Sequence, residues 1–194
     1  MNRRGFLMTG TTGAAGLAAS SEIFAPISKA EEAVQKTIPR RKLGKTGEEL
    51  SIVGFAGIVV MNNSQSFANN IVAEAVDRGI NYFDVAPSYG DAQARLGPAL
   101  EPFRKKVFLA CKEGSGGEEG DFTKDSAAKT LDESLRQLRT DHVDLYQFHA
   151  LSKMSQLEQI FGPNGAMEAF QAARKAGKLQ IGRASCRERV CNDV

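Results

Sequence analysis

Tryptophan is absent from this sequence of 194 residues, and only 7% of the residues are aromatic. The composition is otherwise ordinary for a globular domain, because 42% of the residues are hydrophobic and 25% are charged. This balance excludes a disordered or collagenous chain and a protein that crosses a membrane several times.

An excess of one charge is also lacking, since the formal net charge is only +2. Residues 1–30 contribute +2 and residues 181–194 contribute +1, so residues 31–180 carry a net charge of −1. A nearly neutral body offers no electrostatic attraction to nucleic acid or to acidic lipid. We therefore expect neither of them as a partner.

Cysteine is scarce, and its three copies are an odd number. Cys186 and Cys191 lie in a C-terminal segment that we interpret below as non-native. Cys111 is then the one native thiol that we expect, and the sequence predicts no disulfide framework.

Residues 1–30 have the features of an export signal. They begin with the pair Arg3 and Arg4, continue through an uncharged stretch, and end in Ser28–Lys29–Ala30, whose small residues suit a cleavage site. The string RRGFLMTG resembles the twin-arginine signal, which implies the twin-arginine export machinery as a partner and a periplasmic or otherwise exported location. The stretch is too short and too rich in Gly and Thr to be a stable membrane anchor. A disordered or helical N-terminus that happens to contain two arginines is the alternative.

Strands and helices are predicted to alternate over the middle of the chain. Gly44 and Gly47 suit the turn of a short hairpin. The predicted strands are Leu50–Val60, Asn81–Pro87, Lys106–Lys112 and Val143–Ala150, and the predicted helices are Ile71–Gly79, 92–103, Thr123–Arg139 and Gly165–Lys178. This alternation indicates an α/β protein with a parallel sheet. The order fits either half of a (β/α)8 TIM barrel or a small doubly wound sheet.

Four polar residues stand at or just after the C-terminal ends of these strands. Asp84 and Tyr89 follow the second strand. Lys112 ends the third strand, and His149 lies near the end of the fourth. Because those strand ends share one face of a parallel barrel, the four side chains can converge on one pocket.

Their residue types suit the delivery of a proton to a carbonyl oxygen. A phenol is a poor acid at neutral pH, but a neighbouring ammonium favours its phenolate and so strengthens the acid. An aspartate beside that ammonium holds it charged and oriented. A histidine can donate a hydrogen bond to an oxygen on which negative charge develops. Each of the four residues alone would be ordinary, as a loop cap, a packing residue or a surface group.

Around these residues the sequence resembles the aldo/keto reductase family. The strings NYFDVAPSYG, YGDAQARLGPAL, FLACK and LDESLRQLRTDHVDLYQFH stand in the family's order, and the resemblance covers about residues 40–180. It implies a (β/α)8 barrel and a nicotinamide cofactor, usually NADPH and otherwise NADH. It also implies hydride transfer to a small-molecule carbonyl substrate, an aldehyde or a ketone.

The resemblance also implies roles for individual residues. Tyr89 matches the proton donor, Lys112 and Asp84 match the pair that tunes it, and His149 matches the residue that orients the carbonyl. Asp84 is also near the nicotinamide ribose in the family, and Gly57 and Ile58 match a segment whose backbone passes close to the cofactor. No metal site is implied. Use of the same fold as a non-catalytic nicotinamide-binding or sensing module is the alternative.

The glycine-rich string GSGGEEG, residues 114–120, is not a phosphate-binding motif. It lacks the GxGxxG spacing, and its two glutamates would repel phosphate. We expect a surface loop there.

The last residues resemble something other than a protein family. Residues 181–190 read IGRASCRERV, which resembles one reading-frame translation of a short-read sequencing adapter. A (β/α)8 barrel needs roughly 250 residues, whereas residues 31–180 provide only about four of its eight units. We therefore expect residues 181–194 to be a non-native tail, the first and fourth strands to be open edges, and the fragment itself to be inactive. For the tail, the alternative is a natural frameshift or an unusual C-terminus. For the chain, an inert truncated product is a second alternative to the reductase.

Overall fold

The structure, a computed structural model, describes residues 38–113 and 120–186, with side chains as far as residue 182. The strands are β1 (Arg40–Lys42), β2 (Glu49–Ser51), β3 (Phe55–Ala56), β4 (Tyr82–Asp84), β5 (Phe108–Glu113), β6 (Val143–Leu151) and β7 (Leu179–Cys186). The helices are α1 (Gln65–Asp77), α2 (Ala92–Leu100), α3 (Lys124–Gln137), α4 (Met154–Phe161) and α5 (Ala166–Lys175), with 3-10 helices η2 (Gly57–Val60) and η3 (Glu101–Lys106). The predicted export signal, residues 1–30, lies outside the described residues.

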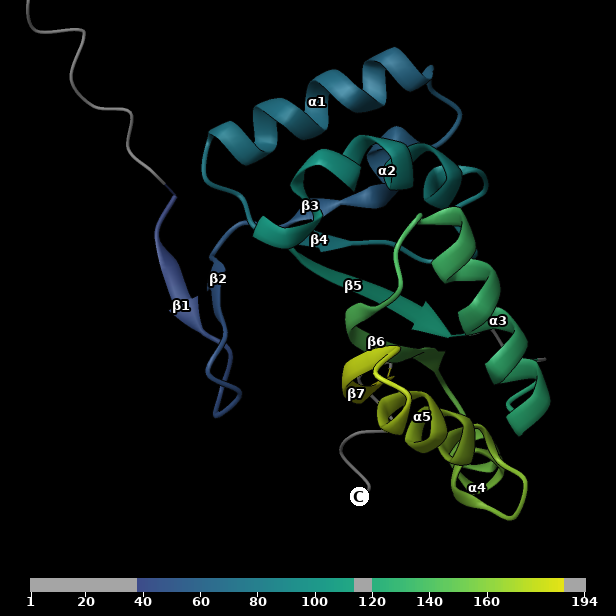
Figure 1. Cartoon of the computed structure of the whole chain (residues 1–194). Helices are drawn as coiled ribbons and strands as arrows, with labels where there is room; N and C mark the ends of the chain where they lie inside the picture. Colours follow the sequence, from purple (N-terminus) through teal and green to yellow (C-terminus); the bar gives the residue numbers. More distant parts are fainter. Residues whose placement is uncertain (1–37, 114–119, 187–194) are drawn as a thin grey trace, which may run out of the picture. The chain divides into compact units, whose positions relative to one another are not determined.

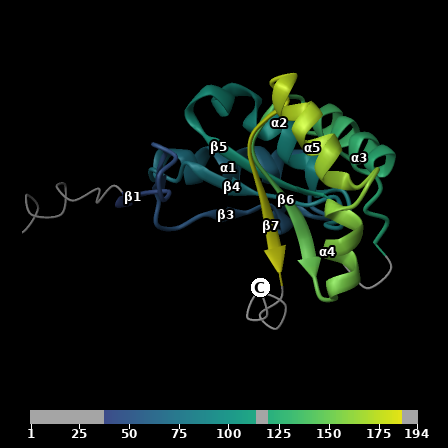
Figure 2. The ribbon, with the colours of Figure 1, turned by 90° about the horizontal axis from the view of Figure 1, so that it is seen from below.

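Strands β3 to β7 form one parallel sheet whose spatial order follows the sequence (Figure 1). Crossovers between parallel strands share one hand, so strands that are always added on the same side carry their helices on the same face. Helices α1, α2, α3 and α5 accordingly form a continuous layer in which each contacts the next (Figure 2). A doubly wound sheet reverses its strand order, and this sheet does not. The order is that of part of a (β/α)8 barrel.

The two faces of the sheet bury different side chains. Leu109 and Cys111 of β5 belong to the large core between the sheet and the helices, whereas Phe108 and Ala110 belong to a second cluster on the other face. This alternation follows from the period of two in a strand. Lys112 therefore lies on the same face as Phe108 and Ala110, which is the face that a closed barrel encloses.

A hairpin covers part of that second face. Strands β1 and β2 pair in antiparallel fashion, and Gly44 and Gly47 in their turn have positive φ angles of 53° and 89°, as their prediction as turn residues requires. Leu43 and Leu50 of the hairpin pack against the second cluster. The hairpin thus buries apolar surface that the sheet leaves uncovered.

The prediction of one buried strand over Leu50–Val60 was wrong. The chain leaves β2 at Ser51, whose hydroxyl donates to the Val53 carbonyl at 2.7 Å, and enters the sheet only at β3. Ile52 and Val53 between the two strands are about half exposed, at 53% and 50%. The apolar run is divided because its first part pairs with the hairpin and its second part with β4.

One helix begins earlier than predicted, and another was not predicted. Helix α1 begins six residues before the predicted start at Ile71, because the Ser64 hydroxyl accepts a hydrogen bond from the Phe67 N–H at 3.1 Å and caps the helix. It ends before Gly79, as predicted, with φ of 92° at that glycine. Helix α4 was not predicted. Within the described residues, no helix has the length and hydrophobicity to cross a bilayer.

The expectation that the strands end at the fourth was also wrong. Strand β7 pairs with β6 from Leu179, opposite Val143, to Cys186, opposite Leu151. Leu179 is only 2% exposed. The edges of the described sheet are therefore β3 and β7. The non-native origin of residues 181–194 remains a prediction from sequence.

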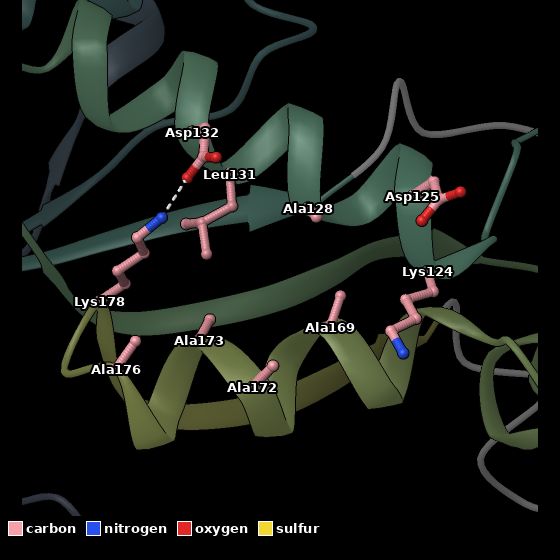
Figure 3. Close-up of a pocket in the computed structure, with 10 residues that line it drawn as sticks. All are labelled: Lys124, Asp125, Ala128, Leu131, Asp132, Ala169, Ala172, Ala173, Ala176 and Lys178. Atoms are coloured by element: carbon pink, nitrogen blue, oxygen red, sulfur yellow. Dashed lines mark hydrogen bonds and ion pairs between the residues drawn. The ribbon is translucent and has the colours of Figure 1, made fainter.

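A groove runs between helices α3 and α5 (Figure 3), and an ion pair lies near each of its ends, of which the figure draws the one between Lys178 and Asp132. The Lys178 ammonium pairs with Asp132 at 2.7 Å, and the Lys124 ammonium pairs with Glu168 at 3.0 Å. Alanines of both helices line the groove, among them Ala128, Ala169 and Ala172. Small side chains here allow the two helices to approach each other.

Helices α2 and α3 meet at Gly97, and this contact gives a stability test. A Cβ atom on Gly97 would lie 2.3 Å from the Gln137 carbonyl oxygen and 2.8 Å from the Leu138 backbone. Backbone cannot yield as a side chain can, so we expect Gly97→Ala to lower the free energy of unfolding by about 1–3 kcal/mol. In a helix with free space around the glycine, the same change stabilises the protein by roughly 0.5–1 kcal/mol. The sign of the change in the free energy of unfolding, measured by urea denaturation, therefore shows whether the backbone of α3 blocks this position. Ala94→Ser on the exposed side of α2 should stay within about 0.5 kcal/mol of the parent.

Candidate active site

Three of the predicted site residues meet around one ammonium group. Lys112 of β5 forms an ion pair with Asp84, which ends β4, and the ammonium also donates a hydrogen bond to the Tyr89 hydroxyl at 3.2 Å. The same nitrogen lies 5.0 Å from the centre of the Tyr89 ring. The Lys112 side chain is only 11% exposed and that of Asp84 25% exposed. A charge so far removed from water requires a partner, and Asp84 provides it.

The tyrosine is held by a tight corner between β4 and α2. The Val85 N–H donates to the Ala110 carbonyl at 3.0 Å, which extends the β4–β5 pairing by one residue. The Tyr89 N–H then donates to the Ala86 carbonyl at 3.1 Å, and the Tyr89 carbonyl accepts from the first residue of α2, Ala92. The backbone on both sides of Tyr89 is thus fixed, which limits where its hydroxyl can lie.

His149 reaches the same site from β6. It lies two residues beyond Gln147, which pairs with Lys112 across the β5–β6 ladder. Its ring meets the Tyr89 ring edge to face, with centroids 6.1 Å apart. Its Nδ1 lies 3.5 Å from the Ser88 hydroxyl. The structure therefore brings all four predicted side chains to the C-terminal ends of neighbouring strands.

Gly57 and Ile58, the expected cofactor segment, open η2 directly after β3. A Cβ on Gly57 would lie 2.8 Å from the Asp84 carbonyl oxygen, so only glycine lets this backbone approach Asp84 so closely. The side chain of Ile58 is 45% exposed. Both residues therefore lie beside the strand that carries Asp84. The predicted surface loop Gly114–Gly120 lies almost wholly outside the described residues.

Cys111 lies on the opposite face of β5 from Lys112. Its thiol is fully buried and accepts a hydrogen bond from the Gln93 amide at 3.3 Å. Burial raises the pKa of Cys111 to about 11, so the thiol stays protonated at neutral pH. This cysteine is a packing residue. Within the part of the chain that the structure describes, no three His, Cys, Asp or Glu side chains are grouped as metal ligands.

Glu113, the residue after Lys112, was missed in the sequence. Its side chain is 0% exposed, and neither carboxyl oxygen has a hydrogen-bond partner among the described atoms. Burial and, to a smaller extent, the nearby charge of Asp121 raise the pKa of Glu113 to about 7. The strand period could have revealed it, because the residue after an inward-facing Lys112 faces the helices.

Asp91, the N-cap residue of α2, was also missed. One carboxylate oxygen accepts from the Asn62 N–H at 2.7 Å and the other from the Arg95 Nε–H at 2.9 Å. The Asn62 hydrogen bond, and then the Arg95 guanidinium, hold the pKa of Asp91 below its usual range. No sequence pattern announces a contact between residues that lie so far apart in the chain.

Comparison with known proteins agrees with this geometry. A sequence model of the Aldo/keto reductase family matches residues 53–182, more than half of the chain. The chain belongs to the aldo/keto reductase family. It is 34% identical over 153 residues to L-galactose dehydrogenase of Arabidopsis thaliana, a match that covers 74% of this chain and 47% of that protein.

Two further relatives extend the comparison. The chain is 30% identical over 165 residues to the aldo-keto reductase yakc [NADP(+)] of Schizosaccharomyces pombe, with 77% of this chain and 46% of that protein covered. The structure matches aldo-keto reductase AKR11C1 from Bacillus halodurans, in its holo form, with a TM-score of 0.66 and 28% identity, over 80% of this chain and 53% of that one. This match confirms the predicted fold class. The chain spans about half the length of the curated relatives that it matches.

Glu113 gives this family member a specific pH dependence of stability. Its pKa is higher in the folded state, about 7, than the ordinary value of 4.5. Between these values the unfolded chain has lost the proton and the folded chain has kept it, so stability falls as pH rises from 4.5 to 7 and is level above. The full decrease is about 3 kcal/mol. The Gln side chain in Glu113→Gln cannot ionise, so urea denaturation between pH 4.5 and 7 should show that the free energy of unfolding of this variant lacks the decrease. If the free energy of unfolding of the two proteins changed in parallel with pH, Glu113 would not be its source.

Proposed function

We propose that these residues form the proton-donating half of an NAD(P)H-dependent reductase that converts aldehydes or ketones to alcohols. One observation carries the proposal: the ammonium of Lys112 is paired with Asp84 and donates to the Tyr89 hydroxyl at 3.2 Å. An acid held beside a fixed, buried cation suits a reaction in which a carbonyl oxygen gains a proton. Membership of an oxidoreductase family supports the same conclusion.

Tyr89 is the residue that we assign as the acid. As hydride reaches the carbonyl carbon, negative charge develops on the oxygen, and the Tyr89 hydroxyl proton moves to it. The phenolate that remains is stabilised by the ammonium of Lys112, which already donates to the tyrosine oxygen. Asp84 keeps the ammonium charged and fixed in place, so that little reorganisation is needed during the reaction.

His149 is assigned to the carbonyl oxygen before and during proton transfer. Its ring packs edge to face on Tyr89, so a hydrogen-bond donor and a proton donor lie side by side. Its Nδ1 lies 3.5 Å from the Ser88 hydroxyl. The hydrogen bond from such a donor is stronger in the transition state than in the ground state, because negative charge has by then developed on the carbonyl oxygen.

A nicotinamide fits the residues that surround this donor set, and when bound it supplies the hydride. Gly57, Ile58 and Asp84 are the residues that we expect to contact it. Support comes from the close approach of Gly57 to the Asp84 carbonyl, which brings this segment beside the residue that pairs with Lys112. Of the two cofactors we favour NADPH, because the name of the Schizosaccharomyces pombe relative carries NADP(+).

Reductase activity is proposed for a complete barrel that contains these residues, here called the complete reductase. We propose that the present chain is inactive by itself, since it spans about half the length of its curated relatives. Export by the twin-arginine route is proposed on the sequence of residues 1–30 alone.

Substitution of the acid tests the proposal. In the complete reductase, Tyr89→Phe removes the hydroxyl and keeps the ring, so we expect single-turnover NADPH oxidation with an aromatic aldehyde to slow by on the order of 10²-fold or more. The affinity for NADPH, measured by fluorescence titration, should change little. Lys112→Met should be comparably slow, because the phenolate would lose its cation.

The matched control removes a different hydroxyl from the same region. Tyr82 lies on β4, and its ring packs on Phe108 of the second cluster, so Tyr82→Phe should leave the rate within about threefold of the parent. If Tyr89→Phe were as fast as Tyr82→Phe, Tyr89 would be a packing residue. A protein that binds NADPH tightly and reduces no carbonyl compound would instead support the binding or sensing alternative.

A further inference from the structure

The loop after β3 and the corner that holds Tyr89 are joined by one carboxylate. Asp91 stands two residues after Tyr89, and both of its oxygens are used. One accepts from the backbone N–H of Asn62 at 2.7 Å, and the other accepts from the Arg95 Nε–H, one turn further along α2, at 2.9 Å. The carboxylate therefore bridges η2 and its following loop, on one side, to α2 on the other.

The backbone on both sides of this bridge is constrained. Asn62 has a positive φ of 58°, which few non-glycine residues adopt. Gly90 has φ of 52°, and a Cβ on it would lie 3.3 Å from the Met61 sulfur. A side chain at position 90 would therefore meet Met61, so the loop and the tyrosine corner lie close together beside the hydrogen bond between Asn62 and Asp91.

The bridged loop carries an apolar pair that is exposed. Ile58 and Val59 of η2 are 45% and 43% exposed, although their neighbours Gly57 and Val60 are buried. The Asn63 side-chain amide donates to the carbonyls of Val59 and Met61, at 3.1 and 3.0 Å, which holds the loop together internally. Its buried Val60 anchors the loop to the core, and Asp91 adds a hydrogen bond that joins it to α2.

We infer that Asp91 is a positioning residue, which fastens the Gly57–Asn63 loop to the Tyr89 corner and so keeps Ile58 and Val59 at the edge of the active site. The inference rests on the proposed function, because an edge for substrate exists only if Tyr89 is the acid. Asp91 itself touches neither substrate nor the reacting atoms. Its effect reaches the site through the backbone N–H of Asn62.

A purely structural role for Asp91 is the competing explanation. A carboxylate at the start of a helix interacts favourably with the helix dipole and with Arg95. Two variants separate the roles. Asp91→Asn removes the charge but keeps an oxygen that can accept from Asn62, and Arg95→Gln removes the ion pair while leaving the Asn62 hydrogen bond intact.

The first measurement is amide hydrogen exchange of the Asn62 N–H in the complete reductase. Asp91→Ala should raise its exchange rate at least about tenfold, because a hydrogen bond to a carboxylate is lost. Asp91→Asn and Arg95→Gln should both stay within about threefold of the parent. This readout does not depend on activity.

The second measurement separates KM from kcat with an aromatic aldehyde. Asp91→Ala should raise KM about tenfold, because displacement of Ile58 and Val59 weakens substrate binding. The value of kcat should stay within about threefold of the parent and its pH dependence should not change, because both depend on proton donation by Tyr89. Asp91→Asn should restore the parent's KM.

The results distinguish the positioning role from the proposed function. The positioning role would be overturned, and the proposed function left intact, if Asp91→Ala left the exchange rate of the Asn62 N–H or the KM unchanged. The same holds if Arg95→Gln raised either quantity as much as Asp91→Ala does. A parent protein without reductase activity, or a Tyr89→Phe variant as fast as the parent, would overturn the proposed function and this inference with it.

Discussion

The ion pair between Lys112 and Asp84 is the constraint on which the site depends. It links two neighbouring parallel strands at their C-terminal ends, where the ladder pairs Asp84 with Ala110 and Lys112 projects two residues beyond. Because the ammonium is largely removed from water, its position is defined by its partners. The Tyr89 hydroxyl is one of them, so the geometry of the acid follows from the register of the sheet.

The sequence predicted those parts of the structure that local patterns determine. Strands β4, β5 and β6, helices α3 and α5, and the glycines that end α1 and α5 lie close to their predicted positions. The sequence left two sheet architectures open, because periodicity reveals neither strand order nor the face on which helices pack. It failed at Leu50–Val60, where pairing with a hairpin divides an apolar run, and at β7, where a parallel neighbour stabilises a polar strand.

The candidate site shows the same division between local and distant information. The four polar residues could be found because each follows a recognisable strand and because their spacing resembles a known family. Asp91 could not be found in this way, and for Glu113 the strand period indicates only the face of β5, not the complete burial. The role of Asp91 depends on a backbone N–H twenty-nine residues earlier, and that of Glu113 on complete burial behind the sheet. Both properties arise only when the chain is folded.

The sequential strand order also has a kinetic consequence. Each strand from β4 to β7 pairs with the strand that precedes it in the sheet, but a helical segment lies between the two in the chain, as between Ala110 and its partner Leu145. Parallel pairings of this kind form slowly, because the chain between two strands must close into a loop before the strands can pair. The Lys112 and Asp84 pair nevertheless needs only one such closure, because it joins the neighbouring strands β4 and β5.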